Sequence, residues 1–242
     1  MSDGADRGGS TWILLPTYNE ALNIESFVGE VRGAVPPARI LIIDDGSPDG
    51  TGDIADAIAA RDPQVEVLHR PRKEGLGPAY IAGFRYALEA GGERVVEMDA
   101  DFSHDPRQLP LLIEASENAD LVIGSRYVQG GEVENWGALR RFISRGGSTY
   151  ARFVLGLDVR DLTGGFKCFR RSVLEAIDLD SVASKGYAFQ VEMTYRTVQA
   201  GFSVAEVPIT FRDRRAGSSK MSRTIVAEAA WRVPQLRFGR QP

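Results

Sequence analysis

Five short apolar segments, each followed by polar or glycine-rich residues, recur along the first half of the chain. They lie at residues 12–15, 40–43, 65–68, 94–98 and 121–124. Segments whose apolar residues follow helical spacing separate them, at residues 19–32, 51–61, 78–90 and 106–117. This alternation predicts an α/β fold with a mainly parallel, Rossmann-like sheet and helices on both faces.

Polar clusters follow four of the predicted strands. They comprise residues 16–20, 44–49, 99–103 and 125–127. Because ligands of such sheets bind beyond the carboxyl ends of the strands, we expect the four clusters to converge on one rim. The first cluster is also expected to lead into a helix that Asn19 caps and that turns Leu22 toward the core.

Two aspartates, Asp99 and Asp101, stand at the end of the fourth apolar segment. Side chains two residues apart in an extended chain point the same way, so the two carboxylates are expected to lie side by side. They repel each other unless a cation lies between them. Carboxylate oxygens favour Mg²⁺ or Mn²⁺ that carries a substrate diphosphate. The alternative is an acidic turn that caps a helix beginning near Pro106.

Length and composition bound the domain organisation. The 242 residues are predicted to comprise a disordered tail at 1–10, one domain at 11–222, and an amphipathic helix or tail at 223–242. The tail lacks the apolar core of a signal peptide, and no apolar run approaches the ~20 residues that span a bilayer. The single cysteine, Cys168, excludes an internal disulfide, and two histidines argue against a structural zinc site.

Charge is unevenly distributed along the chain. The net charge is −4, yet residues 139–171 and residues 212–240 each carry eight basic side chains against two acidic ones. Two basic blocks on an acidic protein indicate a phosphate-rich ligand or an anionic membrane face rather than nucleic acid. The second block includes the polar residues 212–222, which are expected to be mobile without a ligand.

The rhythm changes after residue 130. An apolar stripe with helical spacing runs from Leu139 to Leu157, with arginines on its other faces, and Gly146–Gly147 is expected to loosen or bend this helix. Core packing and contact with lipid headgroups both explain the stripe. Residues 204–211 contain Pro208 and are predicted to form an edge strand. Pro234 is expected to limit the C-terminal helix.

A dinucleotide-binding loop is the obvious rival site in a Rossmann-like sheet. Gly75 and Gly77 begin such a motif, but position 80 is tyrosine instead of the third glycine. A glycine loop is also missing after the first strand. A nicotinamide dehydrogenase is therefore not expected.

Taken together, the motifs carry a family resemblance. Four of them occur in order, at Pro16–Glu20, Asp44–Asp49, Asp99–Asp101 and Gly124–Tyr127. This set resembles the family 2 inverting glycosyltransferases of the GT-A fold. Gly130–Trp136 and Gly217–Lys220 are further similar to the dolichol- or polyprenol-phosphate mannosyltransferases. The similarity covers residues 12–222.

The resemblance implies transfer of mannose from GDP-mannose to a polyprenyl phosphate, with Mg²⁺ or Mn²⁺ as cofactor. It implies a short, peripherally attached form on the cytoplasmic face of a membrane, with a membrane protein as a possible anchoring partner. Asp99 and Asp101 would hold the cation, with Ala100 between them, and Ser103 stands where some relatives have a glutamine ligand. The nucleoside pocket would be lined by Pro16, Tyr18, Glu20, Ile43 and Asp45.

Two choices stay open at the level of sequence. Asp44 is the neighbour and rival of Asp45, and Arg215 is the rival of Arg214. Arginine pairs bidentately with phosphate oxygens, so Arg126 and Arg140 suit the acceptor phosphate. Arg214 and Lys220 would close over the diphosphate.

No histidine stands out as a general base. A phosphate monoester does not need one, because its second pKa is about 6 and its oxygen is already nucleophilic at neutral pH. The predicted reaction is therefore direct in-line displacement with inversion. The alternatives are another donor such as UDP-glucose, and a non-catalytic subunit that binds nucleotide sugars.

Overall fold

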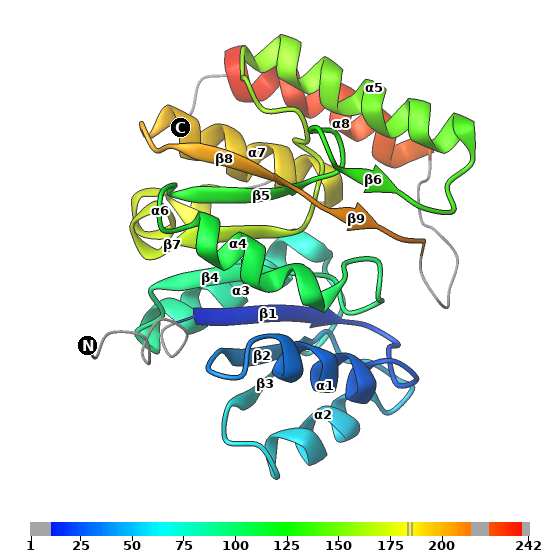
Figure 1. Cartoon of the computed structure of the whole chain (residues 1–242), viewed down its shortest axis with the longest axis vertical. Helices are drawn as coiled ribbons and strands as arrows, with labels where there is room; N and C mark the ends of the chain where they lie inside the picture. The colour runs from blue at the N-terminus through cyan, green and yellow to red at the C-terminus, as the bar shows by residue number, and fades with distance from the viewer. Residues whose placement is uncertain (1–10, 183, 185, 214–222, 239–242) are drawn as a thin grey trace.

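A seven-stranded sheet forms the centre of the computed structural model, which describes residues 11–182, 184, 186–213 and 223–238. Its strand order is β3-β2-β1-β4-β7-β5-β8 (Figure 1). The strands are β1 (Thr11–Thr17), β2 (Arg39–Asp44), β3 (Val65–His69), β4 (Arg94–Glu97), β5 (Leu121–Ser125), β7 (Lys167–Arg170) and β8 (Val204–Pro208). The pairs β1–β2, β1–β4, β2–β3 and β5–β8 are parallel, which confirms the predicted mainly parallel sheet.

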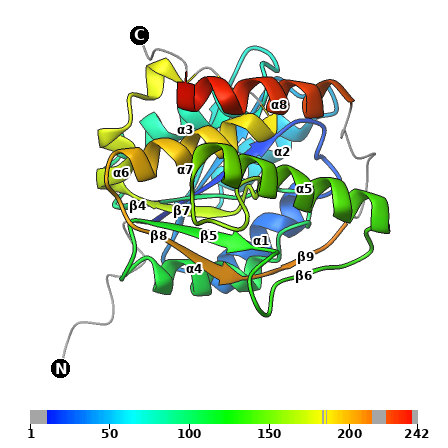
Figure 2. The same ribbon diagram turned by 90° about the horizontal axis from the view of Figure 1, so that it is seen from above.

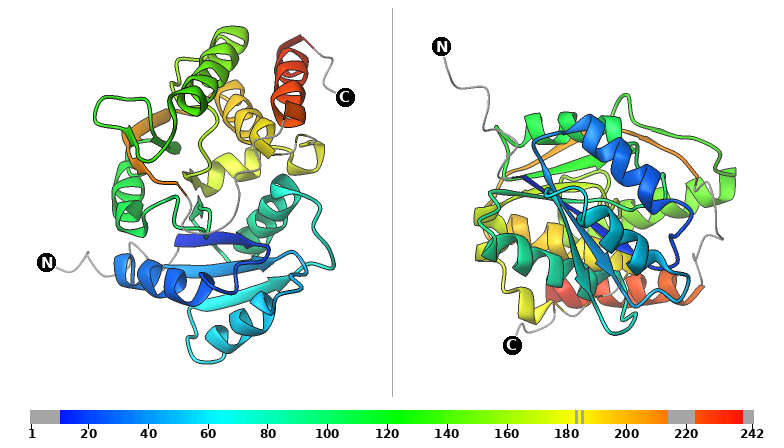
Figure 3. Two further views of the ribbon diagram at one scale, coloured as in Figure 1. Left: turned by 90° about the vertical axis from the view of Figure 1, so that its right-hand side faces the viewer. Right: turned by 90° about the horizontal axis from the view of Figure 1, so that it is seen from below.

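Helices cover both faces of the sheet, as predicted. One face carries α1 (Ile24–Ala34), α2 (Thr51–Ala59), η1 (Pro106–Gln108) and α4 (Leu109–Ala115). The other carries α3 (Leu76–Glu89), α6 (Arg171–Ala176), η2 (Leu179–Ser181) and α7 (Gly186–Gln199), with α5 (Ala138–Leu155) and α8 (Arg223–Phe238) beyond them. Figure 2 and Figure 3 show the layers from above, from the side and from below.

The strand sequences explain the two layers. Trp12 and Leu14 of β1 pack into the core cluster under α3 and α7, whereas Ile13 and Leu15 pack into the cluster under α1 and α4. Alternate residues of a strand point to opposite faces, so a strand covered on both sides has to be apolar throughout. The short apolar runs in the sequence are therefore the central strands themselves.

Strand β7 is the exception to the parallel arrangement. It lies between β4 and β5 and runs antiparallel to both. Because it runs the opposite way, its amino-terminal end lies at the rim where β1, β2, β4 and β5 end. The loop before it, residues 161–166, therefore emerges at that rim.

The start of the first helix differs from prediction. Asn19 adopts a left-handed conformation with φ of 61°, a turn follows, and α1 begins only at Ile24 after Asn23. Asn19 is thus part of a loop and not a helix cap. Leu22 is 90% exposed, so its predicted position in the core is wrong. An asparagine tolerates the left-handed region, which favours the loop here.

The two outer helices bear on an alternative that the sequence left open for α5 and correct the expectation for Pro234. α5 runs without interruption through Gly146 and Gly147, and several of its large apolar side chains are exposed rather than packed in the core. Pro234 lies inside α8 and does not end it.

A second, two-stranded sheet joins β6 (Glu132–Val133) to β9 (Thr210–Phe211), and β8 is an edge strand as predicted. None of the helices in the described parts of the chain has both the length and the apolar character needed to cross a bilayer.

Candidate active site

Two loops at the rim are joined by hydrogen bonds. The amide of Glu20, in the loop after β1, donates to Thr51 Oγ1 at 2.9 Å. The amide of Ala21 donates to Asp49 Oδ2 at 3.1 Å. Asp49 also accepts from the Thr51 hydroxyl, at 2.6 Å. The first two polar clusters of the sequence therefore form one rigid unit at the carboxyl ends of β1 and β2.

The adjacent aspartates of the second loop have different partners. Asp44 accepts the amide and the hydroxyl of Ser47, at 3.1 and 2.5 Å, and so shapes the turn. Asp45 accepts from Arg70 at 2.5 Å through Oδ1. Burial raises the pKa of Asp45 above its ordinary value, although the guanidinium of Arg70 opposes that shift. Since both Asp44 oxygens are engaged within the loop, Asp45 is the better placed of the two to meet a ligand.

The other residues predicted to line the nucleoside pocket lie at different depths. Tyr18 is partly buried, and the ammonium of Lys73 lies 3.8 Å from the centre of its ring. Pro16 and Glu20 are partly buried as well. Ile43, by contrast, has no exposed surface and packs in the core beside Leu14. Its side chain is unavailable to a ligand, so only its backbone remains for such contact.

The loop after β4 presents the paired aspartates. Asp101 Oδ1 accepts the amide of Ser103 at 3.0 Å, which fixes the turn. The amide of Asp99 donates to Nδ1 of His104 at 3.3 Å. Phe102 lies between these residues with φ of 63°, a conformation that is uncommon for a bulky side chain and marks a constrained loop. His104 therefore orients the backbone of Asp99, a role that sequence analysis missed.

Negative charge is concentrated behind this loop. Burial, followed by the charges of Asp99, Glu97 and Asp101, raises the pKa of Tyr80 well above its ordinary value. Burial also raises the pKa of Glu97 to about 7, against the opposing charge of Lys167, its partner across the β4–β7 ladder. The three carboxylates thus lie in one region, where Lys167 offsets the charge of Glu97 and the charges of Asp99 and Asp101 favour a cation.

The loop at residues 99–103, called the acidic loop below, carries side chains of the kind that bind divalent cations. In the described residues, no group of three or more His, Cys, Asp or Glu side chains could hold a metal ion. Magnesium in proteins is commonly bound by one or two carboxylates together with substrate phosphates and water. The pair Asp99 and Asp101, with the buried Ser103 hydroxyl that has no hydrogen-bond partner among the described residues, fits that kind of site. Ala100 is buried and contributes no ligand atom from its side chain.

Arg126, after β5, is held in a buried ion pair. Its Nε donates to Asp161 Oδ2 at 2.7 Å, and its Nη2 donates to Asp161 Oδ1 at 2.6 Å and to Thr163 at 2.9 Å. Burial opposes the charged form of Arg126, but Asp161 outweighs it and raises the pKa of the guanidinium. Burial likewise opposes ionisation of Asp161, whereas Arg126 holds its pKa below the ordinary value. A Cβ at Gly131 would lie 2.5 Å from the Ser125 carbonyl, so the chain needs glycine there to pass this site.

A second arginine, Arg140, lies close by in the first turn of α5. Its guanidinium lies 4.1 Å from the centre of the Trp136 ring and donates to Asp213 at 3.0 Å. The Nε of Arg140 and the indole Nε1 of Trp136 are buried and have no acceptor among the described residues. Two N–H donors without an acceptor, one on the guanidinium itself and one on the adjacent indole, suit an anion with several oxygens.

Phe211 links the acidic loop to the arginine cluster, which consists of Arg126 and Arg140. Its ring centroid lies 5.4 Å from the Arg126 guanidinium and 5.2 Å from the centre of the His104 ring. The amide of Arg212 donates to the Ser103 carbonyl at 3.0 Å. The acidic loop and the arginine cluster therefore share one wall of the rim.

Comparison with known proteins agrees with this geometry. Residues 12–178 match the model of glycosyl transferase family 2. The chain belongs to glycosyltransferase family 2. The undecaprenyl-phosphate mannosyltransferase of Micrococcus luteus is 56% identical over 91% of this chain and 90% of that protein. The polyprenol monophosphomannose synthase of Mycolicibacterium smegmatis is 51% identical over 93% of this chain and 86% of that protein.

Solved structures show the same fold. A glucosyl-3-phosphoglycerate synthase from Mycobacterium tuberculosis, in complex with Mn²⁺ and UDP-glucose, has a TM-score of 0.69 at 21% identity, over 97% of this chain and 81% of that one. A mannosyltransferase from Pyrobaculum calidifontis, in complex with GDP-mannose and Mn²⁺, has a TM-score of 0.60 at 17% identity, over 94% and 61%. Identities this low establish the fold of the glycosyltransferase and nothing finer.

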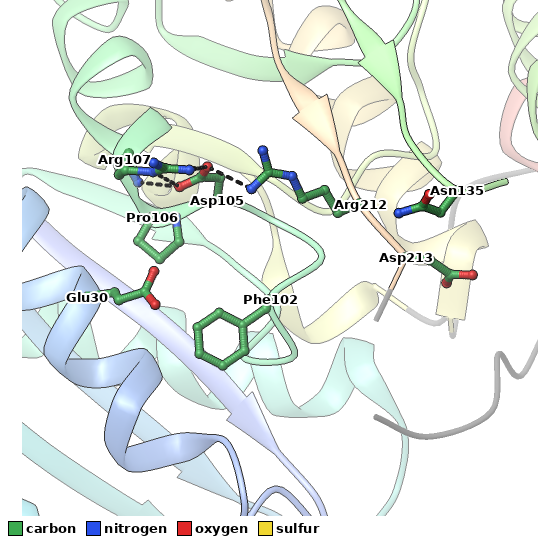
Figure 4. A pocket seen from close by; sticks show the side chains of 8 residues that line it. All are labelled: Glu30, Phe102, Asp105, Pro106, Arg107, Asn135, Arg212 and Asp213. Atoms are coloured by element: carbon green, nitrogen blue, oxygen red, sulfur yellow. Dashed lines mark hydrogen bonds and ion pairs between the residues drawn. The ribbon is translucent and has the colours of Figure 1, made fainter. Parts of the chain in front are cut away.

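A pocket of about 190 Å³ lies beside the acidic loop of this glycosyltransferase (Figure 4). It is lined by Glu30, Phe102, Asp105, Pro106, Arg107, Asn135, Arg212 and Asp213. Its charges are largely matched internally, because Asp105 binds Arg107 at 2.6 Å and Arg212 at 3.5 Å. It contains none of the residues predicted to bind substrate.

Some site residues were missed or remain to be placed. Arg214 and Lys220 lie outside the described residues, as does Arg215. Asp161 and Arg70 were not singled out from the sequence, yet they hold Arg126 and Asp45. Each is separated from its partner by at least 25 residues, and no spacing in the sequence signals the pairing.

Proposed function

We propose that this glycosyltransferase moves mannose from GDP-mannose to a polyprenyl monophosphate, with inversion, and yields polyprenyl phosphate β-mannose and GDP. The names of the two relatives, both more than half identical to this chain, support the mannosyl group and the polyprenyl acceptor. The observation that carries the proposal is the wall around Phe211, which joins an acidic loop suited to a cation with an arginine cluster suited to an anion.

The donor would bind at the joined loops after β1 and β2. Asp45 and Glu20 offer carboxylate acceptors to the base or ribose of the nucleotide, and Tyr18 offers an aromatic face. The diphosphate would then lie toward Asp99 and Asp101. A divalent cation bound there, Mg²⁺ or Mn²⁺, supplies charge neutralisation for the departing nucleoside diphosphate. Arg214 and Lys220 are proposed to close over the same group.

The acceptor phosphate would bind at Arg126 and Arg140. Both guanidiniums already have a carboxylate partner, Asp161 or Asp213, but the unused N–H groups of Arg140 and Trp136 need an acceptor that a phosphate supplies. The two arginines position the phosphate oxygen and reduce its repulsion from the donor.

Neither histidine is available as a general base. His104 is 2% exposed and accepts the Asp99 amide, and His69 pairs with Asp56 on the surface at 2.9 Å. A phosphate monoester is ionised at neutral pH, so its oxygen attacks the anomeric carbon directly. This arrangement favours one in-line displacement with inversion.

The decisive test substitutes Asp101→Asn and measures transfer of labelled mannose from GDP-mannose to a polyprenyl phosphate. Asparagine keeps an oxygen for the Ser103 amide, so the loop should hold its shape while the negative charge is lost. Activity should fall by at least about a thousandfold. Asp105→Asn, on the same loop, is the control and should retain most activity. Near-normal, metal-dependent activity in Asp101→Asn would remove this residue from the mechanism.

The rival functions are separable in the same assay. Competition by UDP rather than GDP would favour a donor such as UDP-glucose. Binding of nucleotide without turnover by the wild type would favour a non-catalytic subunit. We further propose that the protein acts peripherally at the cytoplasmic face of a membrane, where a lipid phosphate acceptor is accessible. An anchoring membrane protein stays a prediction from the sequence.

A further inference from the structure

Helix α5 is oriented with its apolar face outward. Its large apolar side chains at helical spacing are exposed: Leu139 by 73%, Phe142 by 77% and Phe153 by 86%. The buried side carries the small residues Ser148 and Ala151, each 1% exposed, and only near the end of the helix a large apolar one, Leu155. A helix in a globular protein normally places its apolar stripe on the core. The reversed orientation therefore calls for an external partner.

The same helix is strongly basic. It carries Arg140, Arg141, Arg145 and Arg152 and contains no acidic residue. Arg145 is exposed, whereas Arg140 is tied to Asp213 and Arg152 to Asp158. Exposed aromatic and aliphatic side chains flanked by arginines are typical of helices that lie in the interface of an anionic bilayer.

Helix α8, which contacts α5, carries further exposed apolar side chains. It lies beside α5 at one end of the molecule (Figures 1 and 2) and is joined to it by Arg237, which donates to the Val154 carbonyl at 2.6 Å. Trp231 and Phe238 of α8 are 72% and 76% exposed. A tryptophan that is apolar along its body and polar at one end suits the headgroup layer.

The inner side of α5 contacts the arginine cluster of the active site. Tyr127 donates to Ser144 at 2.7 Å, and Ser148 lies 3.2 Å from the hydroxyl of Thr163, which in turn accepts from Arg126. One helix, about 10 Å across, thus separates the outer apolar surface from the residues proposed to bind the acceptor phosphate. An acceptor anchored beneath α5 would have its phosphate within reach of that cluster.

We propose that the outer surface of α5, with Trp231 and Phe238 of α8, docks on the surface of an anionic lipid bilayer and presents the active site to the lipid-borne acceptor. This proposal deepens the proposed function, and only its statement about the lipid-borne acceptor rests on that function. The basic charge of α5 decides between occupants, because a second copy would bring another exposed Arg141 and Arg145 against this surface and like charges repel. A bilayer with anionic headgroups complements both its apolar and its basic groups.

Sedimentation of the full chain with vesicles tests the docking directly. The wild type should bind vesicles that contain phosphatidylglycerol, and more weakly those of phosphatidylcholine alone. Phe142→Ser with Phe153→Ser should weaken binding by about tenfold or more, because two phenyl groups no longer leave water. Leu111→Ser removes an exposed leucine of α4 and should bind as the wild type does.

Charge is tested separately by Arg145→Glu. Binding to anionic vesicles should fall by roughly tenfold and binding to neutral vesicles should not change, since only the electrostatic attraction is lost. Arg61→Glu makes the same charge change at an exposed position in the turn after α2 and is the control. Equal losses in both variants would show a general charge effect and overturn the role of this surface.

Transfer assays distinguish this proposal from the proposed function. The double phenylalanine variant should lose transfer to long-chain polyprenyl phosphate in vesicles and keep transfer to a short, dispersed prenyl phosphate without vesicles. Vesicle binding by a wild type that uses neither acceptor would refute the proposed function and leave the docking surface standing. A wild type that ignores vesicles, or a stable dimer that the double variant dissociates, would overturn the docking proposal.

Discussion

Replacing Asp161 by asparagine should destabilise the protein and weaken use of the acceptor. Asp161 is fully buried and binds the buried guanidinium of Arg126 through both oxygens. Asparagine keeps the size of the side chain and an acceptor for the Arg126 amide, so neither a cavity nor a lost backbone bond complicates the result. What changes is the charge, together with one acceptor whose place an amide NH2 takes, and Arg126 is left buried without its counter-ion.

The magnitude follows from that uncompensated charge. Breaking a buried ion pair by removing one partner costs about 3–5 kcal/mol. For a chain of this size each kcal/mol lowers the melting temperature by about 2–4 °C, so a fall of about 12 °C is expected by calorimetry. The pKa of Asp161 is held below its ordinary value, so the pair contributes fully at neutral pH and is lost only as the pH falls through that lowered pKa.

A second variant separates stability from function. Arg126→Met with Asp161→Asn removes both charges and should recover most of the melting temperature, because no unpaired charge stays buried. If Arg126 binds the acceptor phosphate, the double variant should still have an acceptor KM raised at least about tenfold, with the donor KM unchanged. Normal acceptor kinetics in a stable double variant would show that Arg126 is only structural.

Three further outcomes test the fold. Gly83→Ala should cost about 1–3 kcal/mol in denaturant unfolding, because the new Cβ would lie 2.5 Å from an Ile43 methyl, whereas Gly29→Ala meets nothing within 4 Å and should stabilise α1 slightly. Burial raises the pKa of Cys168 to about 11, so a thiol reagent at pH 8 should label it only on unfolding; fast labelling of the native protein would contradict this. The folded state binds the Glu97 proton more tightly than the unfolded state, with a pKa of about 7 against 4.5, so this group contributes stability that is lost as the pH rises between those values. Glu97→Gln should therefore reduce the fall of the melting temperature between pH 5 and 7. An unchanged dependence of the melting temperature on pH would refute this.

The strands were predictable because they are buried on both faces. Their apolar runs are short, uninterrupted and bounded by turn residues, so the sequence signal coincides with the physical cause. Strand β7 was harder, since it includes the fully buried Lys167, which a search for apolar runs does not select. Lys167 is accommodated by bonds to the Gln190 carbonyl and the Thr194 hydroxyl on α7, far along the chain.

The orientation of α5 illustrates a general limit. Helical spacing in the sequence shows that a helix has an apolar stripe, but it does not show whether the stripe faces the core or the outside. That choice depends on what the neighbouring elements offer, and here small residues such as Ser148 and Ala151 fit the tight inner contact. Leu22 was misplaced for a related reason, because the backbone turns at Asn19 and takes it out of the helix.

The site shows the same division. Sequence order predicted which loops meet, because parallel strands deliver their carboxyl ends to one rim. It did not predict which carboxylate pairs with which arginine. Asp161 and Arg126 are 35 residues apart, and only the reversed direction of β7 brings the loop before it to the same edge.

That reversed strand also sets a length. With β7 between them, the ends of β4 and β5 stand two strand spacings apart, or about 10 Å. Direct pairing of the two strands would halve the gap. On the proposed reaction, this gap has to hold one sugar ring with a phosphoryl group on either side. On that reaction, the spacing between neighbouring strands, more than any loop, sets the distance between the leaving diphosphate and the attacking phosphate.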